Sequence, residues 1–536
     1  MFILSIVLRL LYLQVYQHDF YSDIAKNQSS FTVKINQNRG TIKDGKGEVL
    51  AENIHTASLY VNANKLQNPA EFILKIKSSG LSISSKYSKS ILNRNNFVWL
   101  ARGVDIKRAE SISKIDENIG YVVHEKRFYP QGSTVGKLLG FTGIDNQGLE
   151  GVEGYFDKKL EGDEVKLSFF RDSRGKTIVF EDRIEKTENH DSIYLSIDSN
   201  LQKTLFYILK SDVERFEAKS GLAAAMNVHT GEILFSVSYP TFDPNNYQQY
   251  NKNLWKDGLF NYIFEPGSIL KGVTFSILSE TGKLNLSKKV NCENGSYKVY
   301  DHVFNDVHKY GTITSEEVFS NSSNIGTIKL AEELDNKVFH DYLKRFGFGQ
   351  QIKITGAFTE AGYLRNSKDW SGLSKPSISI GQEILVTPLQ VLQFYSAIAN
   401  GGYKITPQIL KSENTTKEKI LSDNTVATMQ RLLRKVVLEG TGTNANSTFF
   451  GIAGKTGTAQ KFDKTTNSYS QKDYNAGFVG FFPTEAPRFA MIVIYDSPRK
   501  SIYGGSTSAH TFRKMAEQIG IKYGFGIQKV AVNNVN

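Results

Sequence analysis

The residues with the clearest capacity for chemistry fall in three short motifs, at positions 268–271, 322–324 and 455–458. They read Ser-Ile-Leu-Lys, Ser-Ser-Asn and Lys-Thr-Gly-Thr. Ser-x-x-Lys followed by Ser-x-Asn and then Lys-Thr-Gly is a signature of serine acyl transfer. Each motif alone is frequent by chance, so the prediction depends on their order and spacing.

Ser268 is the predicted nucleophile and Lys271 its predicted base. A Pro-Gly pair places Ser268 at the start of a helix, and a spacing of three puts Lys271 on the same helix face. A serine hydroxyl is a weak nucleophile until a base takes its proton. The ordinary lysine pKa of ~10.4 must fall by roughly three units for that role. Burial and a second cation lower a lysine pKa, and Lys455 is the cation expected beside Lys271.

The middle motif supplies a relay and a polar anchor. We expect Ser322 to pass a proton between Lys271 and the amine that leaves or enters. Asn324 is expected to hold a substrate amide, because its side chain both donates and accepts hydrogen bonds. These four residues form the predicted catalytic set: Ser268, Lys271, Ser322 and Asn324.

The third motif suits a ligand carboxylate. Four residues form the predicted substrate-binding set: Lys455, Thr456, Gly457 and Thr458. The amine and two hydroxyls can bind a carboxylate, while Gly457 lets ligand and backbone approach closely. The backbone N–H groups of Ser268 and Thr458 are candidates for an oxyanion hole, which typically contributes ~3 kcal/mol per donor.

Similar patterns elsewhere have simpler interpretations. Ser-x-x-Lys also begins at Ser111, Ser173 and Ser497, and Lys-Ser-Gly occurs at 219–221. Ser-Asp-Asn at 422–424 precedes apolar residues at helical spacing, so we expect a helix cap there. The three main motifs taken singly are also more often caps, turns or loops. Caps need no partner motifs elsewhere, so the ordered set favours catalysis.

Composition narrows the function classes. The net charge of +11 comes from 65 basic and 54 acidic residues spread along the chain, which suits an anionic membrane or wall polymer. No nucleic-acid-binding module is recognisable. Cys292 is the single cysteine, which excludes an internal disulfide and a cysteine-cluster metal site. We expect no metal and no cofactor.

The first 16 residues are apolar except for Ser5, Arg9 and Gln14. A spanning helix needs ~20 apolar residues, so we interpret 1–16 as a partial transmembrane anchor whose start lies upstream. A buried amphipathic helix is the alternative.

The remaining chain divides into two larger units and a tail. Residues 17–190 read as a β-rich, extended and non-catalytic unit, with a surface insertion at 78–96. Residues 191–526 mix apolar runs at 222–228, 232–237, 476–482 and 489–495 with helical stretches around Ser268, Ser322 and 388–399. This order predicts an α+β domain in which helices cover an antiparallel sheet. Residues 527–536 form the tail.

The motifs and their flanks resemble the class B penicillin-binding proteins, specifically the septal peptidoglycan D,D-transpeptidases of cell division. The resemblance includes Asn-Arg-Gly-Thr-Ile at 38–42, Arg-Phe-Tyr-Pro-Gln-Gly at 127–132 and Gly-Leu-Glu-Gly-Val-Glu at 148–153. It continues through 172–175 and 194–202 and covers nearly the whole chain. The region 145–148 and the sequence through Gly175 favour a septal over an elongation enzyme.

This resemblance implies a single-pass protein of the inner membrane, with an anchor, a pedestal of the dimerisation type (17–190) and a periplasmic transpeptidase domain (191–526). Ser268 would attack the penultimate D-Ala of a stem peptide, D-Ala would leave, and a neighbouring amine would complete the cross-link. β-Lactams would acylate the same serine. The implied partners are peptidoglycan stem peptides, a multi-pass lipid-II polymerase and other division proteins.

Two other functions use the same serine. A β-lactamase or D,D-carboxypeptidase would let water finish the reaction, whereas a β-lactam sensor would signal through a membrane domain. Ser323 stands where class A β-lactamases have Asp, which favours a penicillin-binding protein. The long unit before the catalytic motifs disfavours a free-standing β-lactamase, and the single short apolar run disfavours a multi-span sensor.

Overall fold

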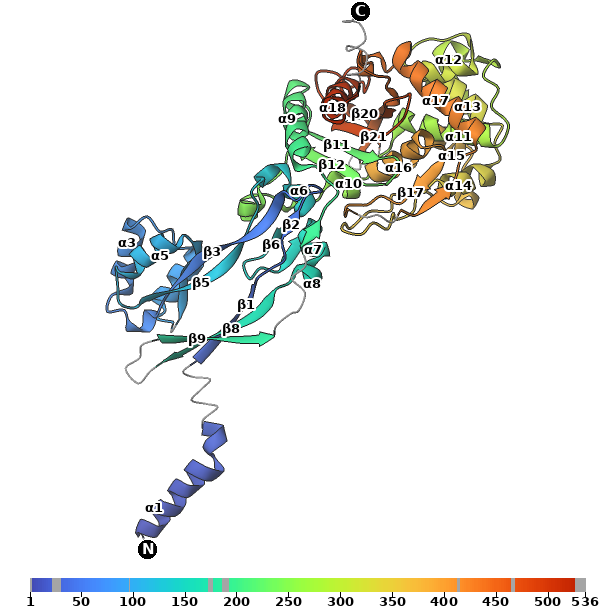
Figure 1. The fold of residues 1–536 in the computed structure, drawn as a ribbon. Helices are drawn as coiled ribbons and strands as arrows, with labels where there is room; N and C mark the ends of the chain where they lie inside the picture. Colours follow the sequence, from blue (N-terminus) through green and yellow to red (C-terminus); the bar gives the residue numbers. More distant parts are fainter. Residues whose placement is uncertain are drawn as a thin grey trace, which may run out of the picture.

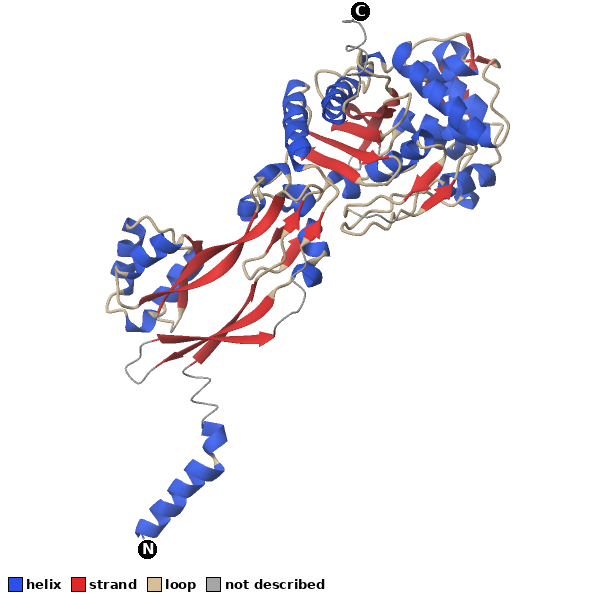
Figure 2. Cartoon of the chain, in the orientation of Figure 1, coloured by secondary structure: helices blue, strands red, loops and turns tan. Residues whose placement is uncertain are grey.

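The computed structural model describes residues 2–21, 30–95, 97–171, 177–185, 192–411, 415–463 and 468–525. The chain is elongated, with helix α1 at one end and a domain of sheet and helices at the other (Figure 1). Between them lies a stretch made largely of long strands, with helices at its margins (Figure 2). We call this middle part the pedestal.

A five-stranded antiparallel sheet, in the order β12-β11-β21-β20-β19, forms the centre of the C-terminal domain. Its strands are β11 Ser220–Asn227, β12 Ile233–Tyr239, β19 Ala453–Asp463, β20 Ser468–Phe482 and β21 Phe489–Asp496. Leu222 and Ala224 enter one hydrophobic core, while Ala223 and Ala225 enter the other. Both faces are therefore covered, which explains why β11, β12, β20 and β21 contain continuous apolar runs.

Helices form the outer layers of this domain. On one face of the sheet lie α9 Ser199–Arg215 and α18 Ser508–Tyr523, and on the other lie α11 Lys271–Glu280, α16 Pro388–Ala399 and α17 Asp423–Leu438 (Figure 1). All residues of α16 are buried, and its two glutamines, Gln390 and Gln393, donate to backbone oxygens. The predicted arrangement of helices over an antiparallel sheet is confirmed.

The pedestal contains a second five-stranded sheet, in which β10-β2-β3-β4 are neighbours and β5 also pairs with β3. Its strands are β2 Ile42–Lys43, β3 Val49–Val61, β4 Val98–Val104, β5 Ile119–Phe128 and β10 Ile193–Tyr194. A separate three-stranded sheet contains β1 Ser30–Gln37, β8 Asp163–Arg171 and β9 Thr177–Glu185. Helices α3 Pro69–Ser78, α4 Ser85–Leu92 and α5 Ile106–Ser113 lie at one end of the pedestal (Figure 1).

Most described residues of the segment 78–96, expected as a surface insertion, are exposed, but the segment is also anchored in the fold. Helix α4 lies within this segment, and Leu81, Ile83 and Ile91 are buried in a local hydrophobic core. The segment is rich in serine, lysine and asparagine because most of its residues face solvent, and three apolar side chains are enough to anchor it.

The shorter elements complete the chain. In the pedestal they are α6 Gly136–Leu139, β6 Phe141–Thr142, β7 Gly148–Glu150, α7 Gly151–Tyr155 and α8 Asp157–Leu160. In the C-terminal domain they are α10 Gly258–Asn261, β13 Lys289–Asn291, β14 Ser296–Val299, β15 His302–Asn305, β16 Thr312–Thr314, α12 Ser315–Ser320, α13 Asn324–Ala331, α14 Asn336–Arg345, α15 Ser374–Ser379, β17 Tyr403–Ile405 and β18 Lys417–Lys419.

A buried ionic cluster holds the pedestal together. Glu153 Oε2 accepts from Arg39 Nε at 2.8 Å, and Glu153 Oε1 accepts from Arg127 Nε at 2.6 Å. Burial raises the pKa of Glu153, but the two guanidinium groups outweigh burial and hold it below its ordinary value. Three segments singled out in the sequence, 38–42, 127–132 and 148–153, therefore meet at one point.

Polar contacts attach the pedestal to the C-terminal domain. Asp44 Oδ2 accepts from the hydroxyl of Ser199, the first residue of α9, at 2.8 Å. The Asn245 side chain donates to the backbone oxygen of Tyr129 and accepts from its N–H, both at 3.0 Å. The pedestal thus reaches the catalytic domain through hydrogen bonds at separate places.

Helix α1, Phe2–Leu11, contains ten residues and lies in the segment interpreted as a partial anchor. Its described apolar side chains are about half exposed, including Ile6, Val7 and Leu10. Within the described part of the chain, no helix has both the length and the apolar character needed to cross a membrane.

Candidate active site

Ser268 lies in a short 3₁₀ helix, η6 Gly267–Leu270, that runs directly into α11. A 3₁₀ helix has three residues per turn, so Ser268 and Lys271 stand above one another. Gly267 has a φ of +53°, and a β-carbon there would approach the backbone oxygen of Thr458 to 3.0 Å. The turn that carries the serine therefore packs closely against β19.

Lys271 is fully buried and donates to the middle motif. Its Nζ lies 2.6 Å from the backbone oxygen of Ser322, 3.3 Å from Ser322 Oγ and 2.7 Å from Asn324 Oδ1. Lys455, in the third motif, also contacts Ser322: its Nζ donates to Ser322 Oγ at 2.9 Å. Ser322 itself has a φ of +61°, an uncommon left-handed conformation for a residue other than glycine. Its hydroxyl thus lies between two amines.

Burial is the largest influence on the pKa of both lysines. It lowers the pKa of Lys271 from 10.5 to about 7, against the opposing attraction of Asp306. Burial and then the charge of Lys271 lower the pKa of Lys455 well below its ordinary value. The sequence analysis predicted that burial and the charge of Lys455 would together lower the pKa of Lys271. Burial is the main cause, as predicted, whereas the charge effect acts on Lys455, whose pKa Lys271 lowers.

The third motif lies on β19, beside the turn that carries Ser268. Thr456 Oγ1 lies 2.6 Å from Thr441 Oγ1, and Thr458 Oγ1 accepts from the N–H of Gly504 at 3.2 Å. A β-carbon at Gly457 would come within 2.7 Å of Ile269 Cγ1. This glycine therefore makes room for the 3₁₀ helix, a packing reason that the sequence analysis did not anticipate.

The motifs meet at a cavity of about 450 Å³. Five predicted site residues line it: Ser268, Ser322, Asn324, Thr456 and Thr458. Lys271 and Lys455 are fully buried and reach the cavity through Ser322. The structure brings together seven of the eight predicted residues around one space. The eighth, Gly457, supports the wall.

The similar motifs lie elsewhere. Ser422 Oγ accepts from the N–H of Thr425 and caps α17, as predicted. Ser111 lies in α5, and Ser497 donates to Asp496. Ser173 lies outside the described residues.

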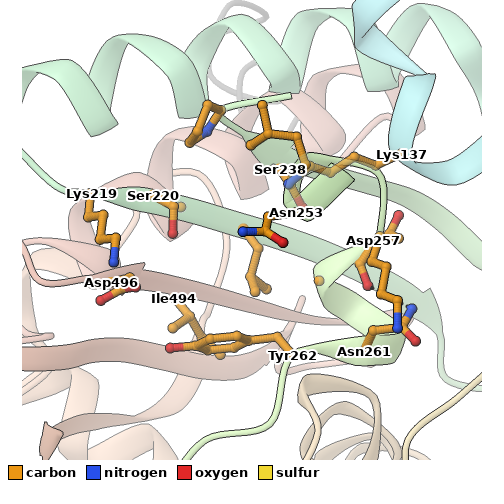
Figure 3. Close-up of a pocket in the computed structure, with 16 residues that line it drawn as sticks. Lys137, Lys219, Ser220, Ser238, Asn253, Asp257, Asn261, Tyr262, Ile494 and Asp496 are labelled. Carbon is orange, nitrogen blue, oxygen red and sulfur yellow. Dashed lines mark hydrogen bonds between the residues drawn. The ribbon is translucent and has the colours of Figure 1, made fainter. Parts of the chain in front are cut away.

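A second cavity of about 390 Å³ contains no residue of the three motifs. It lies over β11, β12 and β21, and is lined by side chains such as Lys219, Ser238, Asp257 and Tyr262 (Figure 3). The chemistry of the motifs therefore belongs to the first cavity.

The sequence analysis missed several residues of the site. Asp306 accepts a hydrogen bond from the Ser323 hydroxyl at 2.7 Å, and His308, Tyr310 and Tyr503 line the cavity. These residues stand in loops without a recognisable motif or periodicity. Only the folding of the β14–β15 hairpin against α13 brings Asp306 to the middle motif.

The family model of the penicillin binding protein transpeptidase domain matches residues 221–517. That of the penicillin-binding protein dimerisation domain matches residues 34–195. The first of these ranges contains all three motifs, and the second contains the buried ionic cluster of the pedestal.

Individual proteins agree with these matches. The peptidoglycan D,D-transpeptidase FtsI of Buchnera aphidicola is 32% identical, over 91% of this chain and 87% of its own. Stage V sporulation protein D of Bacillus subtilis is 30% identical, over 96% and 83%. Penicillin binding protein 3 of Mycobacterium tuberculosis, solved with aztreonam, shares the fold with a TM-score of 0.69, 23% identity and coverage of 92% and 97%. The chain therefore belongs to the class B penicillin-binding proteins, with their dimerisation and transpeptidase domains.

Proposed function

We propose that this protein is a peptidoglycan D,D-transpeptidase that cross-links stem peptides through an acyl-enzyme on Ser268. One observation carries the proposal. Lys271, a buried amine whose pKa is lowered to about 7, lies one turn from a serine that opens onto a cavity of about 450 Å³. Such an amine is neutral often enough near neutral pH to act as a general base.

Acylation begins with a neutral Lys271. Its amine takes the proton of Ser268 as the hydroxyl oxygen attacks the carbonyl carbon of the penultimate D-Ala. The backbone N–H groups of Ser268 and Thr458 bind the oxyanion that forms. The C–N bond then breaks, and the leaving D-Ala amine receives a proton from the Lys271 ammonium through the Ser322 hydroxyl. The hydrogen bond between Lys271 and Ser322 supports this relay.

The second half of the reaction repeats the proton path in reverse. An amine from a neighbouring stem peptide attacks the ester carbonyl and gives its proton through Ser322 to Lys271. The ester C–O bond breaks, and Lys271 returns the proton to the Ser268 oxygen. The product is a peptide cross-link and free enzyme. β-Lactams would acylate Ser268 by the same first step, because their strained amide presents an equivalent carbonyl.

The donor's terminal carboxylate is proposed to bind the third motif. Thr456 and Thr458 line the cavity and can donate their hydroxyl protons. The buried amine of Lys455 lies behind them, and burial and the charge of Lys271 lower its pKa in the free site. A carboxylate nearby raises a lysine pKa, so ligand binding would make Lys455 cationic.

We further propose that the enzyme works at the division septum. Support comes from the septal resemblance of the pedestal sequence and from the identity with FtsI of Buchnera aphidicola. The exposed apolar residues of α1 fit one end of a single-pass anchor in the inner membrane, with the remaining chain in the periplasm. A multi-pass lipid-II polymerase and other division proteins are the proposed partners. Depletion should give filaments without septa, whereas rounded cells would favour an elongation enzyme.

Labelled penicillin tests the nucleophile directly. The full chain is incubated with the label, and the adduct is located by mass spectrometry. We expect a long-lived adduct on Ser268 that is absent from a folded Ser268→Ala variant. An adduct that persists in that variant would refute the assignment.

Turnover separates the transpeptidase from its rivals. A D-Ala-D-Ala stem peptide is supplied with and without an acceptor amine, and the products are separated by mass. Aminolysis that exceeds hydrolysis supports the transpeptidase. Hydrolysis that the amine does not divert indicates a carboxypeptidase, and rapid loss of the penicillin adduct indicates a β-lactamase.

A further inference from the structure

We propose that Asp306 is a positioning residue for this reaction, because its carboxylate fixes the middle motif against Lys271. Asp306 directly follows β15, outside all three motifs, and is half-buried. The inference rests on the proposed acylation of Ser268. It extends the functional site to the β14–β15 hairpin.

The Asp306 carboxylate accepts three hydrogen bonds from the start of α13. Oδ2 accepts from Ser323 Oγ at 2.7 Å, and Oδ1 accepts from the backbone N–H groups of Asn324 and, at 3.1 Å, Ile325. The neighbouring Asn305 contributes its backbone oxygen, which accepts from Asn324 Nδ2 at 2.8 Å. Two successive residues therefore hold both the main chain and the side chain of Asn324.

This hold determines which end of the Asn324 amide faces the active site. Because Nδ2 donates to Asn305, the oxygen Oδ1 is directed to Lys271 Nζ, 2.7 Å away. If the Asn324 amide were reversed, its NH₂ group would face the Lys271 amine and Lys271 would lose this acceptor. The hairpin thus prepares an acceptor for Lys271, and the same anchoring keeps Ser322 within reach of it.

Helix capping alone does not explain the carboxylate. Ser323 is already the N-cap of α13, with its hydroxyl accepting from the N–H of Gly326 at 2.9 Å. One side-chain cap is the usual complement of a helix start. The additional bonds from Asp306 hold Ser323 and Asn324 in place, which is what a reaction depending on their geometry requires.

The charge of Asp306 also acts on the base. Burial is the largest influence on the pKa of Lys271 and lowers it, while Asp306 raises it by attraction. Other titratable groups face Lys271, Asp306 or their neighbours: Cys292, Tyr310, Lys329 and Lys455. Burial raises the pKa values of Cys292 and Tyr310, so neither gains a charge near neutral pH.

Two substitutions separate geometry from charge. Asp306→Asn keeps an oxygen for the backbone N–H groups of α13, and its new NH₂ can donate to the Ser323 hydroxyl, so mainly the charge is lost. Asp306→Ala loses the charge and the hydrogen bonds. Asp301→Asn, in the exposed turn between β14 and β15, is the matched control. The readout is the second-order rate constant for labelled penicillin from about pH 5 to about pH 8.5, with thermal unfolding to verify the fold.

We expect Asp306→Ala to lower the rate constant about 10- to 100-fold while Asp301→Asn leaves it unchanged. For Asp306→Asn, the acid limb of the pH profile should move about one unit lower, because Lys271 loses an attractive charge. A purely structural role would lower the rate at all pH values without moving this limb.

The inference is overturned if Asp306→Ala stays within about twofold of the unsubstituted protein, or if the Asn variant's acid limb does not move. If the Ala variant does not fold, the Asn profile decides. Failure of the unsubstituted protein to form an adduct would instead refute the proposed function.

Discussion

The pH dependence of Ser268 acylation provides the sharpest test of the buried base. Lys271 has its pKa lowered from 10.5 to about 7 by burial, a difference of about 5 kcal/mol in favour of the neutral amine. At pH 7 about half of the sites would hold a neutral Lys271, roughly 10³-fold more than with an ordinary lysine. The site therefore offers a base without needing alkaline conditions.

The rate constant for penicillin acylation should follow the neutral fraction of Lys271. Below about pH 7 it should fall about tenfold per pH unit, and above this value it should level off. Lys271→Arg should lower the plateau by about 10²- to 10⁴-fold, since a guanidinium does not lose its proton near neutral pH. Both measurements use labelled penicillin, with circular dichroism as the control for folding.

Two results would contradict this reasoning. The first is a rate constant that does not change between about pH 5.5 and about pH 8 in folded protein, because the base would then not titrate in this range. The second is an arginine variant that retains the plateau rate. Either result would transfer the role of base to another group.

Three further substitutions test separate parts of the structure. Gly457→Val places side-chain atoms where even a β-carbon comes within 2.7 Å of Ile269, so acylation should fall by about tenfold or more in a folded protein, as measured with labelled penicillin. Glu153→Ala removes the carboxylate shared by two buried guanidinium groups; Arg39 keeps Asp157 but Arg127 loses its carboxylate partner, so the pedestal should be destabilised by about 3–5 kcal/mol in urea unfolding. Because the pKa of Glu153 is depressed in the folded state, its contribution is present above the unfolded pKa and is lost as pH falls through the folded pKa. Ser422→Ala removes the N-cap of α17, so it should lower the free energy of unfolding by about 1 kcal/mol and leave acylation unchanged. Loss of acylation in this variant would instead indicate that the motif at 422–424 takes part in catalysis.

The sequence predicted those features whose signal lies within a few neighbouring residues. Four of the five strands of the central sheet were visible as apolar runs, whereas β19 was not. Helix α16 matched the predicted 388–399, and a capping serine explained 422–424. The catalytic motifs were also local. Their order along the chain was enough to predict that they would meet, because unrelated caps and loops need not occur in that order.

Features that depend on contacts between distant segments could not be predicted. Asp306 is an ordinary acidic residue in the sequence and becomes part of the site only because its hairpin packs on α13. The charge relation between Lys271 and Lys455 depends on how deeply each amine is buried, which local sequence does not encode. The segment 78–96 shows the same limit, since three buried side chains among many polar ones leave no clear periodicity.

The two buried lysines also connect ligand binding with activation of the serine. Both amines donate to Ser322 Oγ, and the charge of Lys271 disfavours a charge on Lys455. On the proposed mechanism, a ligand carboxylate raises the pKa of Lys455 and makes it cationic. A cation beside Lys271 then disfavours the protonated form of that base. Binding of the correct ligand would therefore increase the neutral fraction of Lys271 when a carbonyl is in place. At saturating ligand, the first-order acylation rate constant of a ligand without a carboxylate should have its acid limb at higher pH than that of a ligand with one.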